Sequence, residues 1–309
     1  MGIVARVYKK RFVCRFDKEV GVPYYSCSDF EGLKEESFSF VNSKRIEIHY
    51  FFYYCDNHQE NKIVLFCPGM GPGHVSYLRE IEELARRGYK VLTLDYVGCG
   101  ESKGKCLGSL NAPTRDVMDL LKHLNLDKNI ILVGHSLGGF TALKVASLIK
   151  DITKVVVLAP IVTTRIMIYN ASKSNFITKH VLKYERKVEK EYDSIDLPKY
   201  LANTTDSIMF IQSVDDPMVP YDSSLKVAEE INNPHIQTIR FENRKHNPNY
   251  TEEAVEYMNE VFGGYNRLTK YKKIASDEER IAYFKDVSID KLTEQDKSLF
   301  DKIEHFINN

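Results

Sequence analysis

The sequence lacks an excess of charge of either sign. Its 309 residues carry 43 lysines and arginines against 43 aspartates and glutamates, so the formal net charge is zero. Proteins that hold nucleic acid or an anionic membrane surface through a broad electrostatic field usually carry a one-signed excess. The charge balance therefore argues against a nucleic-acid partner and indicates that any ligand is recognised locally, by a few side chains.

Long apolar runs are also missing. No stretch approaches the roughly 20 consecutive apolar residues of a membrane-spanning helix. Residues 1–16 carry charges throughout, without the apolar core of a secretion signal. Gly2 invites comparison with the myristoylation signal, but Arg6 stands where that signal needs serine or threonine. The sequence predicts no integral membrane segment, no secretion by a signal peptide and no lipid anchor.

Cysteine patterns that hold metals or disulfide frameworks are absent. The six cysteines are scattered, with no CxxC pair and no Cys/His cluster at zinc spacing. They are Cys14, Cys27, Cys55, Cys67, Cys99 and Cys106. Several lie inside apolar runs, where buried unreactive thiols are common. We therefore predict no metal site and a reducing, cytoplasmic environment.

From residue 62 onward the chain alternates short β-branched runs with stretches of helical period. Continuously apolar runs of this kind are typical of strands buried on both faces, as in parallel sheets covered by helices. The expected strands are 62–67, 90–95, 129–134, 154–159, 207–212 and 236–241, with helices around 77–85 and 117–124. The alternation predicts an α/β fold with a doubly wound, mostly parallel sheet.

The remaining segments are assigned around this sheet, within a single domain over 1–309. Residues 37–54 are expected to form antiparallel edge strands, and residues 1–36 more edge strand and loop. Residues 161–206 separate two strands and keep helical spacing of apolar residues, so we expect a small helical cap there. The cap carries more lysine and arginine than glutamate. An excess of basic side chains is typical of a solvated helix face. The alternative is that the basic cap favours an anionic substrate.

A second irregularity follows the last expected strand. Residues 251–262 have helical character, and Gly263-Gly264 is expected to end that helix. A polar insertion over 265–290 then leads to a final helix near 296–307, which is expected to pack back on the sheet.

One motif carries chemistry directly. Gly134-His-Ser-Leu-Gly-Gly139 follows an expected strand and precedes a helical stretch. Glycines two before and two after Ser136 permit a sharp strand-to-helix turn that projects the hydroxyl above the sheet, the arrangement called a nucleophile elbow. The pattern alone is weak, but its position between strand and helix makes it specific. Ser136 is therefore the predicted nucleophile.

A serine nucleophile needs a base to take its proton and a carboxylate to orient that base. Beyond such an elbow the partners follow in the order Asp or Glu, then His. Asp215 and Asp216 both follow the fifth parallel strand, and His246 follows the sixth. His235 would lie at the wrong end of that strand, and His305 falls in the terminal helix. Because parallel strands end at one edge of the sheet, His246 is the predicted base and either aspartate is placed to orient it.

These motifs resemble the α/β-hydrolase superfamily, in particular its serine carboxylesterase and monoglyceride-lipase-like branches. The matching pieces cover about residues 40–262 and the last helix; they are 68–71, 95–102, 134–139, 216–220 and His246. The family pattern Asp-x-x-Val-Pro matches Asp216 to Pro220, so the resemblance implies Asp216 as the acid rather than Asp215.

The resemblance also implies an oxyanion hole made by the backbone N–H groups of Met70 and Leu137. Two positions depart from the family. Pro68 stands where a histidine is often found, and Lys245 stands where a glycine usually precedes the catalytic histidine. The first change bears on the rigidity of the loop that contains Met70, the oxyanion loop. The second bears on the path of the loop that contains His246, the histidine loop.

The activity implied by the resemblance is that of a serine hydrolase. It would cleave a carboxylic ester or thioester of a small-molecule acyl substrate through an acyl-serine intermediate, with no cofactor and no metal. Acyl transfer and peptide cleavage remain open because they use the same triad. A non-catalytic binding module would have a broken triad, which this sequence does not have.

Two neighbouring features are interpreted as structural. The glycines around Pro72 lack the following Lys-Ser/Thr of a phosphate-binding P-loop, and Pro72 removes a backbone donor. His74 is expected to be an exposed loop histidine, with a place in the substrate crevice as the alternative. Residues 95–102 are expected to form a turn without a catalytic role.

Overall fold

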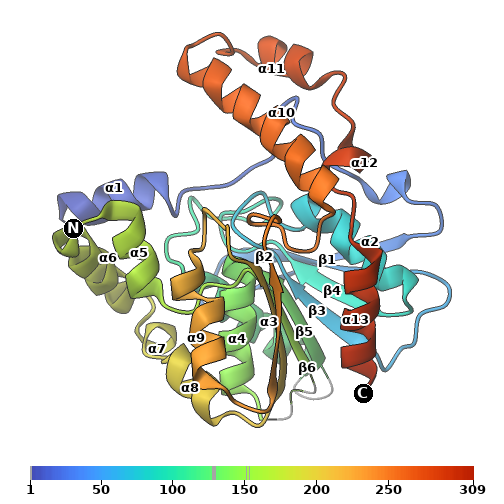
Figure 1. Cartoon of the computed structure of the whole chain (residues 1–309), viewed down its shortest axis with the longest axis vertical. Coiled ribbons are helices and arrows are strands. Elements are labelled where there is room, and N and C mark those ends of the chain that lie inside the picture. The colour runs from blue at the N-terminus through green and yellow to red at the C-terminus, as the bar shows by residue number, and fades with distance from the viewer. Residues whose placement is uncertain (1, 127–129, 151, 153) are drawn as a thin grey trace.

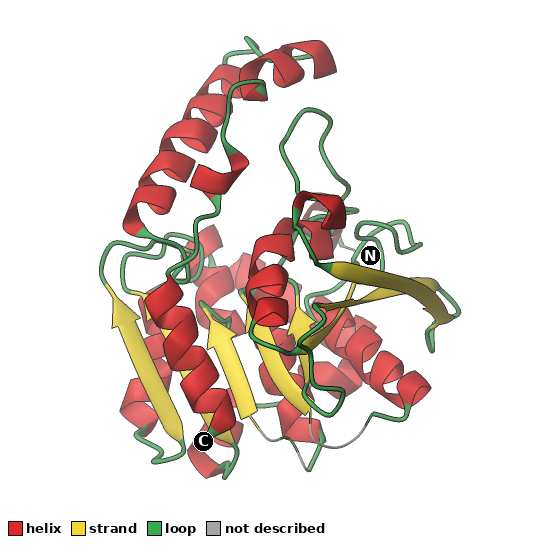
Figure 2. Cartoon of the chain, turned by 90° about the vertical axis from the view of Figure 1, so that its right-hand side faces the viewer, coloured by secondary structure: helices red, strands yellow, loops and turns green. Residues whose placement is uncertain are grey.

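The computed structural model describes residues 2–126, 130–150, 152 and 154–309, and within them the chain forms one eight-stranded sheet with helices on both faces (Figures 1 and 2). The strands are β1 (Lys34–Val41), β2 (Glu47–Tyr54), β3 (Ile63–Cys67), β4 (Lys90–Leu94), β5 (Ile130–His135), β6 (Lys154–Leu158), β7 (Ser207–Ser213) and β8 (Ile236–Phe241). Their order is β1-β2-β4-β3-β5-β6-β7-β8. β2 pairs antiparallel with β1 and β4, and β3 to β8 are parallel. The predicted mostly parallel α/β sheet is confirmed; the expected strand start at Asn129 lies outside the described residues.

Helices on the two faces of the sheet enclose two apolar layers. One layer packs under α2 (Leu78–Arg86) and α13 (Lys297–Asn308), so the final helix returns to the sheet as expected. The other packs under α3 (Ala112–Leu124), α4 (Leu137–Leu148) and α9 (Leu225–Ile231). Within the described part of the chain, no helix combines the length and apolar character needed to cross a bilayer.

The outermost parallel strand differs from its neighbours in burial. β5, β6 and β7 are almost wholly buried, whereas Gln237, Thr238 and Arg240 of β8 are exposed. The expectation that 236–241 is covered on both faces was wrong. β8 is the edge strand of the described sheet, next to β7, so its outward positions meet water, which its polar residues tolerate.

The segment between β6 and β7 forms a group of helices beside the sheet. They are α5 (Thr164–Ser172), α6 (Asn175–Val188), α7 (Lys190–Asp193) and α8 (Leu197–Asn203). The N-terminal helix α1 (Ile3–Arg11) packs against α6 of this group (Figure 1). The expectation of edge strand and loop over 1–36 missed this helix, whereas β1 does begin within that range, at Lys34. Contacts with the cap helices, which lie far away in the sequence, hold this nine-residue helix.

A helical arm projects away from the sheet at the top of Figure 1, and Figure 2 shows the same arm from the side. It consists of α10 (Glu252–Lys270), α11 (Asp277–Phe284) and α12 (Ile289–Leu292). The expected helix end at Gly263-Gly264 was wrong, since α10 continues to Lys270. A Cβ at Gly264 would lie 2.5 Å from the hydroxyl of Tyr283, which donates a 2.7 Å hydrogen bond to the Val261 carbonyl. The glycine admits a close approach of α11 instead of ending the helix.

Candidate active site

The elbow lies at the turn between β5 and α4. Ser136 has φ 56° and ψ −116°, a conformation that costs a non-glycine residue about 1–3 kcal/mol. A hydrogen bond from the Ser136 N–H to the Leu158 carbonyl of β6, 2.8 Å long, holds it in place. A Cβ at Gly134 would collide with the Gly138 carbonyl, and one at Gly138 would collide with the Cys67 carbonyl of β3. The glycines are thus required by the close packing of the turn.

The histidine and one of the aspartates meet at the same edge of the sheet. His246, in the loop after β8, places Nδ1 2.8 Å from Oδ2 of Asp216, in the loop after β7. The other oxygen of Asp216 accepts the backbone N–H groups of Met218 (2.7 Å) and Val219 (3.0 Å). A carboxylate held in this way accepts the Nδ1–H, so the neutral imidazole keeps its lone pair on Nε2. That nitrogen is free to take a proton.

The second aspartate has other partners. Asp215 accepts hydrogen bonds from the Ser213 hydroxyl (2.6 Å) and the Lys245 N–H (3.1 Å), and it pairs with the Lys245 ammonium at 2.8 Å. Partial burial opposes ionisation, but the bonds from Lys245 and Ser213 keep the pKa of Asp215 below its ordinary value. Lys245 itself has φ 49°, a left-handed conformation that glycine adopts easily. Its two contacts with Asp215 fix the histidine loop where the family has glycine.

A buried histidine links the elbow to the histidine loop, and the sequence analysis missed it. His135 donates from Nε2 to the His246 carbonyl (2.7 Å), and its Nδ1 accepts the hydroxyl of Tyr77 (2.9 Å). Burial, together with the nearby His246, lowers the pKa of His135 to about 3, so it stays neutral. The two rings have centroids 4.7 Å apart. Because His135 directly precedes Ser136, this contact places His246 beside the elbow.

The two predicted oxyanion donors lie at the ends of adjacent strands. Met70 follows β3 and Leu137 begins α4 after β5, and β3 pairs with β5 up to Cys67 and Gly134. Within the described residues, neither backbone N–H is engaged in a hydrogen bond. The Pro68 carbonyl accepts a 3.0 Å bond from the buried Tyr96 hydroxyl. This contact anchors the loop at the position where the family often has histidine.

His74 is buried instead of exposed, so that expectation was wrong. Its Nδ1 lies 2.8 Å from Oδ1 of Asp95, and its ring stacks on Phe51 with centroids 3.8 Å apart. Asp95 is fully buried and also accepts the Glu101 N–H at 2.8 Å. The buried carboxylate needs donors, which the sequence pattern does not indicate. His74 satisfies it and takes no place in the crevice.

No group of three or more His, Cys, Asp or Glu side chains in the described ranges is arranged to hold a metal ion. The cysteines are free thiols, and Cys55, Cys67 and Cys99 are buried. Burial raises the pKa of Cys67 to about 12, which keeps its thiol protonated and unreactive.

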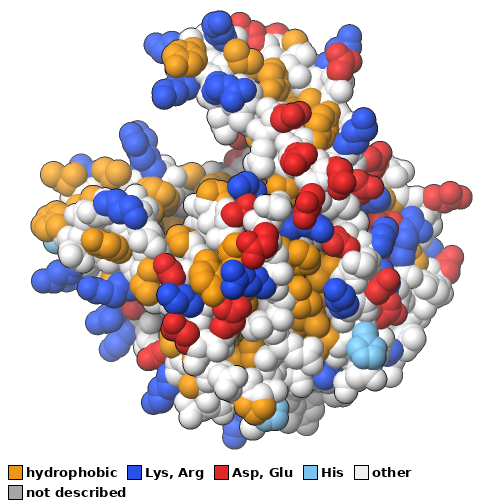
Figure 3. Space-filling model, viewed as in Figure 1, with side chains coloured by type: hydrophobic (Ala, Val, Ile, Leu, Met, Phe, Trp, Pro, Cys, Tyr) orange, Lys and Arg blue, Asp and Glu red, His pale blue; other side chains and the backbone are white. Residues whose placement is uncertain are grey.

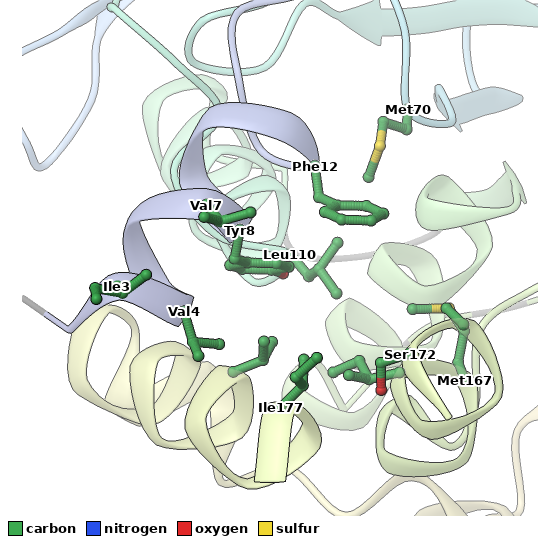
Figure 4. A pocket seen from close by; sticks show the side chains of 13 residues that line it. Ile3, Val4, Val7, Tyr8, Phe12, Met70, Leu110, Met167, Ser172 and Ile177 are labelled. Carbon is green, nitrogen blue, oxygen red and sulfur yellow. The ribbon is translucent and has the colours of Figure 1, made fainter. Parts of the chain in front are cut away.

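An apolar pocket of about 420 Å³ opens beside the loop that follows β3 and contains Met70 (Figure 4). Side chains from α1, α5 and α6 line it, together with Met70 and Leu110.

Comparisons with known proteins point to hydrolases. The family model of the serine aminopeptidases S33 (Hydrolase_4) matches residues 58–193. An Agrobacterium fabrum protein named as a carbamate hydrolase, RutD, is 32% identical over 89 residues, which are 28% of this chain and 33% of that protein. A Haemophilus influenzae protein named as an esterase/lipase is 28% identical over 107 residues, 35% of this chain and 37% of that protein. The matched segments thus span about a third of the length of these two relatives.

Solved structures extend the likeness to most of the chain. An esterase of Pyrococcus furiosus superposes with a TM-score of 0.59 at 18% identity, covering 83% of this chain and 98% of that chain. At this level of identity the likeness concerns the fold, whose active sites vary in chemistry.

Proposed function

As this chain belongs to the α/β-hydrolase superfamily, we propose that it is a serine hydrolase that cleaves a carboxylic ester or thioester through an acyl-serine intermediate. The observation that carries the proposal is the 2.8 Å contact between His246 Nδ1 and Asp216 Oδ2, next to the elbow of Ser136. Three chain segments that follow three different strands supply nucleophile, base and acid.

In the acylation step, the Oγ of Ser136 attacks the substrate carbonyl while Nε2 of His246 takes its proton. Asp216 holds the Nδ1–H and balances the charge of the imidazolium that forms. The N–H groups of Met70 and Leu137 stabilise the tetrahedral oxyanion, each donor contributing about 3–4 kcal/mol to the barrier reduction. The imidazolium then protonates the leaving alcohol or thiol, and the acyl group stays on Ser136. Water, deprotonated by His246, releases the acid and restores the hydroxyl.

Amide cleavage is a second candidate, because the matching family model is described as serine aminopeptidase. We place ester cleavage first because two of the comparisons carry esterase names. Matched substrates with the same acyl group on p-nitrophenol and on p-nitroaniline separate the two. A higher kcat/KM on the anilide would reverse this order.

The test of the nucleophile uses a fluorophosphonate probe and p-nitrophenyl butyrate. We expect the native protein to be labelled and active, and Ser136→Ala to lose both properties. Ser147→Ala removes a hydroxyl near the other end of α4 and should behave like the native protein, because Ser147 donates a 2.7 Å bond to the Lys144 carbonyl of its own helix and lies away from the elbow. Equal labelling of Ser136→Ala and the native protein would overturn the assignment. Product analysis with a competing alcohol acceptor tests acyl transfer, since a product ratio that does not change with the acceptor concentration leaves hydrolysis alone.

A further inference from the structure

The pocket beside the oxyanion loop has an unusual wall. Five of its lining residues come from the N-terminal helix α1 and its end: Ile3, Val4, Val7, Tyr8 and Phe12. This helix lies outside residues 58–193, which match the family model. Figure 3 shows hydrophobic side chains gathered over this part of the molecule, with lysine and arginine around them. The other wall is formed by cap helices α5 and α6.

A buried contact fixes α1 as part of the fold. The Tyr8 hydroxyl donates a 2.8 Å hydrogen bond to Glu185 of α6, and the Tyr8 ring packs edge-on against Tyr184 with centroids 5.8 Å apart. The second oxygen of Glu185 accepts the Leu110 N–H (3.1 Å) and the Asn111 side chain (3.0 Å). Glu185 is fully engaged, so the Tyr8 hydroxyl is committed to it and does not offer a polar group to a ligand.

The pocket interior therefore favours an apolar ligand group. Among its lining residues only Tyr8 and Ser172 carry a polar side-chain atom, and none is charged. The basic side chains of the cap, such as Lys179 and Lys183, are not part of the lining. A carboxylate, phosphate or sugar would lose its hydration here without a partner in return. A hydrocarbon chain would lose nothing, and a volume of about 420 Å³ lies in the usual range for small-molecule sites.

One residue connects this pocket to the chemistry. The backbone N–H of Met70 is a proposed oxyanion donor, and the Met70 side chain lines the pocket opposite the Phe12 ring (Figure 4). A substrate carbonyl whose oxygen lies at the Met70 N–H thus has the pocket immediately beside it. The bound substrate can place its acyl chain there without a change of the fold.

We propose that α1 is a wall of the acyl-binding site, that the site takes a hydrocarbon acyl chain, and that α1 sets the preferred chain length. The inference rests on the proposed function for its chemistry. Burial of one methylene contributes about 0.8 kcal/mol, which corresponds to about a fourfold gain in kcat/KM. We expect this gain for each added methylene until the pocket is full.

The experiment measures kcat/KM of the full chain on p-nitrophenyl acetate, butyrate, octanoate and laurate. The native protein should favour the longer chains over acetate by at least tenfold. Val4→Phe puts a larger side chain into the α1 wall and should lower the ratio of laurate to acetate activity at least tenfold. Lys10→Phe is the matched control, since Lys10 is exposed on the same helix and does not line the pocket. It should keep the native ratio.

A second variant guards against misfolding of the first. Phe12 is 53% exposed, so Phe12→Ala is expected to fold, and the loss of its apolar surface should lower the octanoate-to-acetate ratio. Native ratios in both Val4→Phe and Phe12→Ala, or a native profile that is flat with chain length, would overturn the role of α1. Absence of activity on every ester, with no labelling of Ser136, would instead overturn the proposed function.

Discussion

A buried glutamate beneath the histidine loop should make the stability of the protein depend on pH. Glu80, on α2, is 3% exposed, and its Oε1 accepts the side-chain N–H of Asn249 at 3.1 Å. In the described part of the chain, its other oxygen has no hydrogen-bond partner. Burial raises the pKa of Glu80 from 4.5 to about 7, although the Asn249 bond and the nearby Arg79 oppose the rise. Glu80 is thus protonated in the native state at mildly acidic pH.

The size and sign of the effect follow from linkage. The native state binds the Glu80 proton more tightly than the unfolded chain, so the contribution of Glu80 to stability is fully present below pH 4.5 and is lost as the pH rises through 7. Each pKa unit corresponds to about 1.36 kcal/mol, so the full loss is on the order of 3 kcal/mol above pH 7. Glu80→Gln has no charge to bury and its amide oxygen still accepts from Asn249. We expect it to be more stable than the native protein by up to that amount at pH 8.5.

The assay is urea unfolding of the native protein and Glu80→Gln at pH 4.5 and 8.5. The gain in unfolding free energy from Glu80→Gln should be near zero at pH 4.5 and reach its maximum at pH 8.5. Glu256→Gln is the control, since Glu256 is exposed on α10 and its substitution should give no such pH-dependent gain. A difference between Glu80→Gln and the native protein that does not change with pH would refute the reasoning.

Two further predictions concern the site. Asp216→Asn should lower kcat by about 10⁴-fold, because the amide favours the wrong histidine tautomer. Asp215→Asn leaves the contact between Asp216 and His246 in place and should cost less than about tenfold, or ~1.4 kcal/mol. A loss of less than tenfold in Asp216→Asn would remove Asp216 from the mechanism. Tyr77→Phe leaves Nδ1 of the buried His135 without its donor, so we expect about 1–3 kcal/mol of lost stability together with a lower kcat at unchanged KM. A higher KM at unchanged kcat would mean that Tyr77 contributes to substrate binding and not to the position of the histidine loop.

Much of the central fold could be predicted from the sequence because it depends on local patterns. The strand cores at 63–67, 90–94, 154–158 and 207–213 are apolar runs, and each was predicted to within a residue or two. The strand at 236–241 was predicted as well, but the exposure of its side chains was not predicted. Burial of a strand depends on which strands flank it, and the order of strands in a sheet is a property of the whole chain.

The errors share a cause, which is that distant contacts override local preference. Gly264 is of a residue type that often ends a helix, yet Tyr283 packs against it and the helix continues. Residues 3–11 have only a weak helical signal of their own, and α6 stabilises them. His74 follows a loop rich in glycine and proline, and the buried Asp95 holds it in the interior. Nothing near these residues in the sequence carries that information.

The candidate site divides in the same way. Ser136 and the order of acid and base could be predicted from motifs, because each residue follows a strand end. Sequence reasoning left two aspartates open, and the resemblance favoured Asp216. The structure places Asp216 against His246 and Asp215 against Lys245. The buried contact of Tyr77 with His135 could not be predicted from the sequence. The one hint was that His135 directly precedes Ser136 in the elbow motif.

The central claim is that the acyl group of the substrate becomes attached to Ser136. The direct measurement is mass spectrometry of the enzyme quenched in acid during turnover of p-nitrophenyl octanoate. We predict one added octanoyl group, located to the peptide that contains Ser136 and absent from Ser136→Ala. An octanoyl group on another residue, or its persistence in Ser136→Ala, would contradict the account.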